Sequence, residues 1–258
     1  MQQLLGIDNL IAFGLILLRM TGCIVFNPIF GRRNIPAIMR AGMAMILSIL
    51  IYSYSDISTI GVINSNVEYI VLGIKELCVG FVIGFVVSLF SYIIILGGEV
   101  IDMQMGLAMS KVYDPASNVS LSLNATFYNI LFMFVFFTVN GHLTLMKLFL
   151  ELEKAIPYGH VLIGSDVASA MITVFCQCTI LGMKLAMPMI ALQFLMEMGV
   201  GILMKNIPQI NVIMINIQGK IFVGMVFLVV LFSPVLSFVE GAIEEMFNAI
   251  YQIAKLMG

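Results

Sequence analysis

The chain has 258 residues, of which 61% are hydrophobic and only 10% are charged, and its formal net charge is −2. A soluble domain is about 45–50% apolar and about 25% charged, so this composition excludes a water-soluble globule and indicates an integral membrane protein. A nucleic-acid binder needs a basic stripe, and twelve scattered Lys and Arg residues in a slightly acidic chain exclude that class too.

Six apolar runs approach or exceed the length of about 20 helical residues that crosses the hydrocarbon core of a bilayer. Because unpaired backbone groups are costly in lipid, each run is predicted to be helical. The runs are Leu10–Phe30, Ala37–Tyr54, Leu77–Leu96, Leu121–Val139, Val167–Met204 and Ile213–Phe238. The fifth is long enough for two helices with a break near Pro188. The predicted fold class is therefore all-α, of the integral-membrane type, with about six apolar helices and no sheet.

The connectors and the tail predict orientation and domain organisation. Arg32, Arg33 and Arg40 crowd the first short connector, which places it on the cytoplasmic side by the positive-inside rule. Residues 240–258 combine charged and apolar side chains at the spacing of an amphipathic helix that lies on a surface or a partner. No internal repeat or low-complexity linker is found, so residues 1–258 are predicted to form a single subunit.

Charged residues interrupt the apolar runs, and each costs about 2.5–3.5 kcal/mol at mid-bilayer on insertion scales. Glu99, Asp102 and Glu197 can line an ion or proton pathway, or the charges can pair at a subunit contact. A transporter site usually lies between two matching halves, which this chain lacks, so pairing is favoured. The predicted pairing set is Arg19, Glu99, Asp102, Lys184 and Glu197, with a basic group expected beside Glu99 or Asp102.

Glycine and methionine patterns add two open alternatives. The small-xxx-small pattern from Gly80 to Gly84 either marks a close helix contact or is a chance match. Met103, Met105 and Met109 either fill a core or seal around irregular neighbours, since methionine is flexible. The polar segment after them either occupies a pore or only connects two helices.

Enzyme chemistry is poorly represented. His142 and His160 are isolated, and the sequence contains no His-Glu-x-x-His, Gly-x-Ser-x-Gly or Gly-x-x-x-x-Gly-Lys pattern. No catalytic residue, metal ligand or cofactor is therefore predicted. An intramembrane enzyme would need a convergent catalytic pair, and no pattern supports one.

Four strings, taken in order along the chain, resemble the family of the flagellar biosynthetic protein FliR. They are residues 30–42, residues 98–106 followed by Asp114-Pro115, residues 139–143, and residues 199–212. The resemblance covers nearly the whole chain. It implies a subunit of the export gate of the flagellar type III secretion system, with helices arranged as bent helical hairpins.

The resemblance also implies partners and a location. FliP-type and FliQ-type subunits, with an FlhB-type subunit, are the expected protein partners in a hetero-oligomer whose channel passes unfolded flagellar proteins. The expected location is the bacterial inner membrane, as a multi-pass protein in contact with lipid at the flagellar basal body. No cofactor and no nucleic acid are implied. A small-solute or ion transporter is the alternative function.

A central loop is expected, from the same resemblance, to plug the closed channel. Matching positions place it at residues 106–118, directly after the methionine-rich segment. The expected plug and sealing residues are Met103, Met105, Gly106, Met109, Lys111, Asp114, Pro115, Ser117 and Asn118.

Overall fold

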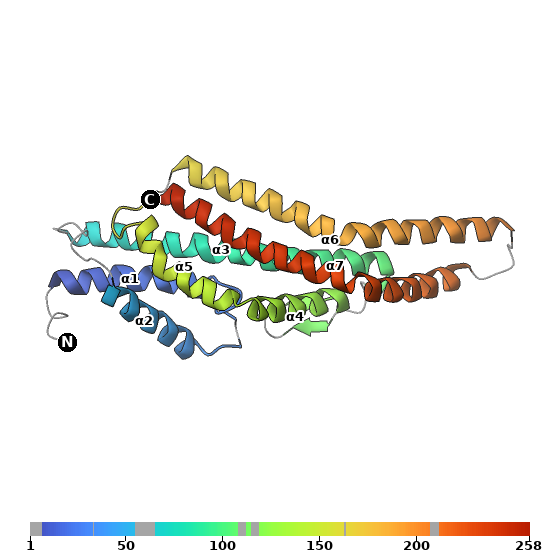
Figure 1. Cartoon of the computed structure of the whole chain (residues 1–258), viewed down its shortest axis with the longest axis horizontal. Helices are drawn as coiled ribbons and strands as arrows, with labels where there is room; N and C mark the ends of the chain where they lie inside the picture. Colours follow the sequence, from blue (N-terminus) through green and yellow to red (C-terminus); the bar gives the residue numbers. More distant parts are fainter. Residues whose placement is uncertain are drawn as a thin grey trace. The chain divides into compact units, whose positions relative to one another are not determined.

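The computed structural model describes residues 7–32, 34–54, 65–107, 112–114, 119–162, 164–206 and 212–258. Seven helices make up almost all of it, which confirms the all-α class (Figure 1). They are α1 (Ile7–Val25), α2 (Ala37–Tyr54), α3 (Asn66–Met105), α4 (Leu123–Thr138), α5 (Gly141–Ala155), α6 (Ser165–Asn206) and α7 (Val212–Met257).

The expectation of no sheet needs one correction. Two three-residue strands, β1 (Val112–Asp114) and β2 (Val119–Leu121), pair antiparallel, with Tyr113 opposite Ser120. An isolated hairpin of this size is marginally stable at best in water. The hairpin lies in the polar stretch between α3 and α4, so it leaves the helical class intact.

Three helices, α3, α6 and α7, are longer than the apolar runs that predicted them. The predicted break near Pro188 does not occur, because this proline lies inside α6, a helix of 42 residues. Pro234 likewise lies inside α7, a helix of 46 residues. Proline lacks the backbone N–H that would bind the carbonyl four residues earlier. The backbone carbonyls of Lys184 and Val230 therefore lack their usual helical donors. Membrane helices tolerate this when neighbouring groups satisfy the freed carbonyls.

The chain forms two compact units within the single subunit predicted from the sequence. Unit 1 comprises residues 1–89, 140–175 and 244–258, and unit 2 comprises residues 90–139 and 176–243. Each unit has its own core, and we describe each separately.

In unit 1, glycines bring α1 and α3 into backbone contact. A Cβ atom on Gly22 would lie 2.9 Å from Cα of Gly80, and one on Gly84 would lie 2.9 Å from the backbone of Phe26. Ser88, four residues after Gly84, donates a hydrogen bond to the Phe26 carbonyl at 3.0 Å. The Gly80–Gly84 pattern therefore marks a specific close contact, as small residues do at membrane-helix interfaces.

The C-terminal residues 240–258 are the end of α7 and not a separate helix. Within unit 1, the apolar side chains of Met246, Ile250, Ile253 and Met257 form one buried stripe. The predicted amphipathic face therefore packs inside this chain. The Met257 carbonyl accepts a hydrogen bond from the backbone of Leu162 at 2.9 Å, which fastens the end of the helix.

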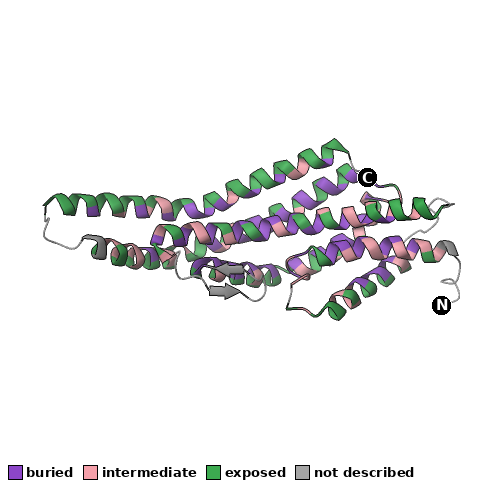
Figure 2. Cartoon of the chain, turned by 180° about the vertical axis from the view of Figure 1, so that it is seen from behind, coloured by how far each residue is buried: buried purple, intermediate pink, exposed green. Residues whose placement is uncertain are grey.

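Burial differs sharply between the long helices (Figure 2). Of the most apolar stretch of α3, 61% is buried, compared with 17% in α6 and 11% in α7. A helix that is apolar on all sides must be covered on all sides. The outer faces of α6 and α7 are therefore built to contact lipid or other protein chains.

Candidate functional site

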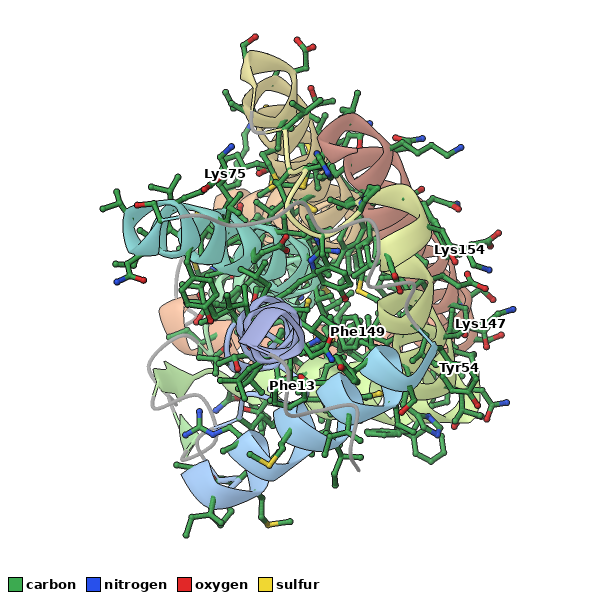
Figure 3. The ribbon with its side chains drawn as sticks, turned by 90° about the vertical axis from the view of Figure 1, so that its left-hand side faces the viewer. Phe13, Tyr54, Lys75, Lys147, Phe149 and Lys154 are labelled. Atoms are coloured by element: carbon green, nitrogen blue, oxygen red, sulfur yellow. The ribbon has the colours of Figure 1, made fainter. Side chains whose placement is uncertain are left out.

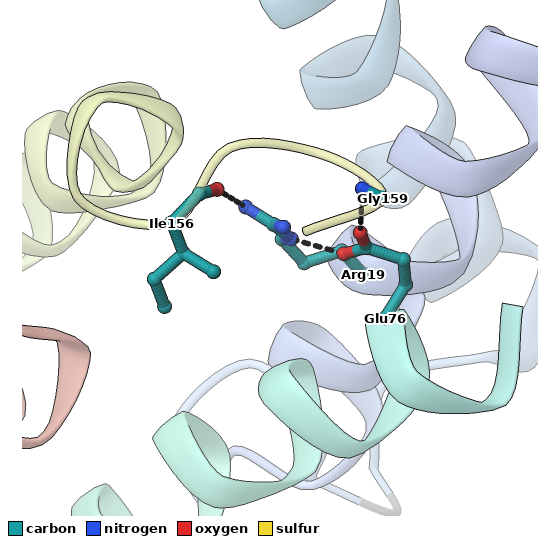
Figure 4. Close-up of polar contacts among 4 residues, drawn as sticks. All are labelled: Arg19, Glu76, Ile156 and Gly159. Atoms are coloured by element: carbon teal, nitrogen blue, oxygen red, sulfur yellow. Dashed lines mark hydrogen bonds and ion pairs between the residues drawn. The ribbon is translucent and has the colours of Figure 1, made fainter. Parts of the chain in front are cut away.

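A fully buried ion pair lies in unit 1, between α1 and α3 (Figure 4). Nε of Arg19 is 2.6 Å from Oε2 of Glu76. Two further groups of this pair bind the loop after α5: Nη1 of Arg19 donates to the Ile156 carbonyl at 2.7 Å, and the Gly159 amide donates to Oε1 of Glu76 at 2.9 Å. Two opposite charges thus neutralise each other and hold three chain segments together.

The ring of Tyr158 completes this cluster. The guanidinium carbon of Arg19 lies 4.0 Å from the ring centroid, which is the geometry of a cation–π contact. Burial raises the pKa of Tyr158 above its usual range, although Arg19 opposes the shift. The hydroxyl therefore stays protonated at neutral pH, so the cluster contains one cation and one anion.

Asp102 is buried near the end of α3, in unit 2. Its Oδ2 accepts a hydrogen bond from the backbone amide of Asn124 at 2.8 Å, and its Oδ1 accepts one from Nδ2 of the same residue at 2.6 Å. Asn124 lies in the first turn of α4, and the N-cap residue Ser122 makes no side-chain capping bond. Asp102 therefore caps α4 from another helix, where a carboxylate also suits the helix dipole.

The expected basic group beside Glu99 or Asp102 does not occur within the part of this chain that the structure describes. Asp102 is satisfied by neutral donors of Asn124. Glu99 is half-buried and takes part in no ion pair among the described residues. A basic partner for Glu99 from another subunit stays a prediction.

Replacing Asp102 tests its capping role. Asp102→Leu leaves the Asn124 amide and side chain buried without an acceptor, which should lower the free energy of unfolding by about 1–3 kcal/mol. Asp102→Asn keeps one acceptor oxygen and should cost less than the leucine variant. Denaturant unfolding of the full chain in detergent, followed by helical circular dichroism, measures both. Equal stability of both variants and the parent chain would exclude the cap.

Glu197 does have a basic partner, and it is Lys220. The two side chains form an ion pair between α6 and α7 of unit 2. Beside them the fully buried Gln193 donates from Nε2 to the Lys220 carbonyl at 3.0 Å. The polar groups of three residues thus meet between two apolar helices.

Lys184 lies on the exposed side of α6, among apolar side chains such as Ile180 and Met187. The structure shows no ion pair for it among the described residues. Its own carbonyl is the one that Pro188 leaves without a helical donor. An ammonium group and a carbonyl that lacks its usual helical donor therefore belong to the same residue of α6.

The expected plug segment begins at the end of α3. Met105 is fully buried and Met103 is 67% exposed. Gly106 has a φ of +78°, which favours glycine, and it ends the helix. Of Asp114 only the backbone is described, in β1, whereas the remaining expected residues lie outside the described residues: Met109, Lys111, Pro115, Ser117 and Asn118.

Met105 fills space within unit 2. A Cβ atom on Gly224 of α7 would lie 2.7 Å from the Met105 methyl carbon, and Nδ2 of Asn124 is 3.7 Å from its sulfur. This contact is core filling of the kind that flexible methionine side chains provide. The sealing role of the segment stays a prediction.

The predicted pairing set does not contain the side-chain partners Glu76, Asn124, Gln193 and Lys220, although Glu76 stands out in the sequence as a charge near an apolar run. Glu76 is 57 positions from Arg19, and no sequence pattern relates the rotation of one helix to that of another. The available signal was weaker: a charged or amide side chain inside an apolar run needs a partner. In the described ranges, no group of three His, Cys, Asp or Glu side chains could hold a metal ion.

Within the described residues, four helices are long and apolar enough to cross a membrane: α2, α3, α6 and the part of α7 from Ile215. A fifth span results if α4 and α5 count as one broken span. These helices carry the multi-pass character predicted from composition. The count is lower than about six because α1 is short and α4 reaches spanning length only together with α5.

Comparison with known proteins gives a consistent result. The family described as bacterial export proteins, family 1, matches residues 10–246. The chain is 26% identical to the flagellar biosynthetic protein FliR of Bacillus subtilis over 98% of both chains. It is also 26% identical to the FliR protein of Escherichia coli, over 92% of this chain and 90% of that one. The sequence identity to the FliR protein of Aquifex aeolicus is 27%, over 78% of this chain and 77% of that one.

Proposed function

The chain belongs to bacterial export proteins, family 1, the FliR family, and from this membership we propose that it is a non-enzymatic subunit of the flagellar type III protein-export gate. It is a multi-pass inner-membrane protein of the flagellar basal body. The observation that carries the proposal is the match over residues 10–246, which includes α2 to α6 entirely and most of α1 and α7.

In the proposed gate, FliP-type and FliQ-type subunits, with an FlhB-type subunit, surround this chain and form a channel for unfolded flagellar proteins. The exposed apolar faces of α6 and α7 support such an assembly, because this chain itself buries only a small share of the residues in their most apolar stretches. The buried charges support it as well. Arg19 and Asp102 are bound in fixed structural contacts, whereas a proton or ion pathway needs groups that exchange partners.

Export of flagellar proteins tests the proposal directly. In a strain that lacks this chain, flagellar subunits should be absent from the medium and accumulate inside the cell, and re-expression of the chain should restore their export. Measuring the exported subunits by immunoblot, with a protein of the general secretion pathway as the control, gives the result. Undiminished export without the chain would contradict the gate, and flux of a small solute through the reconstituted chain alone would favour the transporter.

Lys184 is proposed to pair with a carboxylate of a partner subunit. A lone ammonium facing lipid at mid-bilayer costs about 2.5–3.5 kcal/mol, and a partner carboxylate offsets this cost. Removing one member of a desolvated pair at an interface typically costs about 2–5 kcal/mol. Lys184→Met should therefore lower recovery of partner subunits at least tenfold, whereas Lys184→Arg should retain most of it.

Affinity purification of the tagged chain measures this recovery. Lys205→Met is the matched control, because Lys205 also lies on α6 but belongs to its last turn, where a lysine suits the helix dipole. If Lys184→Met recovered the partners as fully as the control, the proposed pair would be ruled out.

A further inference from the structure

A groove in unit 1 lies between α1 and α2 and has a volume of about 410 Å³. Its walls are Leu17, Thr21 and Val25 of α1 and Ala37, Arg40, Ala41, Ala44 and Met45 of α2. Small alanine side chains leave the space open, and almost all of the lining is apolar. The volume lies within the range of about 300–1,000 Å³ that is typical of ligand sites.

Arg40 is the charged residue of this groove. Its Nε is buried and has no hydrogen-bond partner among the described residues. Its Nη1 makes one long contact, 3.5 Å from the Gly31 carbonyl. The guanidinium group therefore retains unused donors, and a planar guanidinium binds phosphate and carboxylate groups with paired hydrogen bonds.

The stretch of sequence that forms the groove carries only positive charge. Between Asp8 and Asp56 the sequence contains four arginines and no acidic residue. Arg19 is neutralised by Glu76, so the uncompensated charge of this stretch of sequence belongs to Arg32, Arg33 and Arg40. Arg40 also lies in the first turn of α2, which has no acidic residue there, so the helix dipole favours an anion at the same place.

We propose that this groove binds one anionic phospholipid, with an acyl chain along the apolar walls and the headgroup phosphate on Arg40. An apolar groove with a basic residue in its lining has the chemistry of an anionic-lipid site. The positive-inside rule predicts that the connector before α2 is cytoplasmic, and basic pockets on that side recognise anionic headgroups. An apolar protein segment would fill the walls but leave the arginines without an anion. The inference depends on the membrane location of the chain and not on the gate, so each can fail without the other.

A tryptophan reporter tests the site, because the chain contains none. Met45 lines the groove and is 52% exposed, so Met45→Trp places a fluorophore there at low structural cost. The full chain is reconstituted in vesicles that contain brominated phosphatidylglycerol or brominated phosphatidylcholine. The relative binding constant from quenching should favour the anionic lipid about fivefold, as expected for one basic residue.

Second substitutions separate the headgroup from the acyl chain. Arg40→Gln should abolish the preference for the anionic lipid, whereas Lys154→Gln, the same charge change on an exposed part of α5, should keep it. Figure 3 shows Lys154 on the outside of this helix. Ala41→Leu fills the groove from an exposed position and should reduce quenching by both lipids.

Three results would overturn the proposal. Equal quenching by both lipids in the Met45→Trp chain would remove the anionic specificity. A preference that survives Arg40→Gln would assign it to diffuse surface charge. No quenching by either lipid would show that protein covers the groove.

Discussion

Replacing Glu76 with glutamine is expected to lower the free energy of unfolding by about 3–5 kcal/mol, a large part of the total stability of a typical domain. Glutamine has nearly the same shape, but it leaves the fully buried Arg19 without a counter-ion 2.6 Å away. The cost is a desolvated charge, because glutamine offers a single acceptor oxygen where the carboxylate binds both Arg19 and the Gly159 amide. Denaturant unfolding of the full chain in detergent measures the change.

Two controls separate the pair from the simple loss of a charge. The double variant Arg19→Met with Glu76→Leu should be more stable than Glu76→Gln, because apolar replacement of both partners removes the desolvation cost. Lys147→Gln breaks an exposed pair on α5, where Lys147 is 74% exposed and 4.0 Å from Glu151, and should cost less than about 1 kcal/mol (Figure 3). If Glu76→Gln proved as mild as Lys147→Gln, the buried pair would not stabilise unit 1.

Shortening the proposed plug is expected to make the inner membrane leaky. A plug must favour the closed channel by only a few kcal/mol, so that cargo can displace it. Loss of the loop between Gly106 and Asn118 should then raise the open fraction from about 1% to a majority. Cells that carry the deletion should grow poorly and take up a normally excluded small molecule.

The control for this deletion is a deletion within the connector 55–64, which the plug proposal does not involve. Both variants need to recover the same set of partner subunits by affinity purification, so that permeability is compared between assembled complexes. Unchanged permeability in an assembled complex that lacks the loop would remove the plug. The core contacts of Met105 would then be the function of the methionine-rich segment.

The helical class was predictable because lipid leaves the backbone few alternatives. Apolar runs and the requirement for internal hydrogen bonds predict helices wherever the runs occur. Helix ends were not predictable in the same way. α3 begins at Asn66, eleven residues before its apolar run, and includes Lys75 and Glu76. Within this extension Glu76 is buried and pairs with Arg19, a contact that hydropathy does not predict.

The proline positions show the same limit. Pro188 indicated a break between two helices, yet α6 continues through it, as α7 continues through Pro234. Local propensity disfavours proline by about 3 kcal/mol in a helix interior, but long helices are held by packing along their whole length. Sequence alone does not reveal which neighbouring groups compensate for the freed carbonyls.

The polar clusters were predictable in kind but not in partner. The requirement that intramembrane charges be satisfied singled out Arg19, Asp102 and Glu197 as residues in need of partners. Their partners come from helices or loops distant in the chain, and one of them, Asn124, is neutral. Lys184 and Glu99 were singled out by the same argument, and within the described residues they show no ion pair. Their partners are therefore sought outside this chain.

The mass of the particle that contains this chain tests the gate most directly. The tagged chain is extracted from its own membrane in mild detergent, and the particle is weighed by native mass spectrometry. A hetero-oligomer several times heavier than one 258-residue chain, with FliP-type and FliQ-type subunits in fixed proportion, is the predicted result. A stable monomer, with the apolar faces of α6 and α7 covered by detergent alone, would contradict the account.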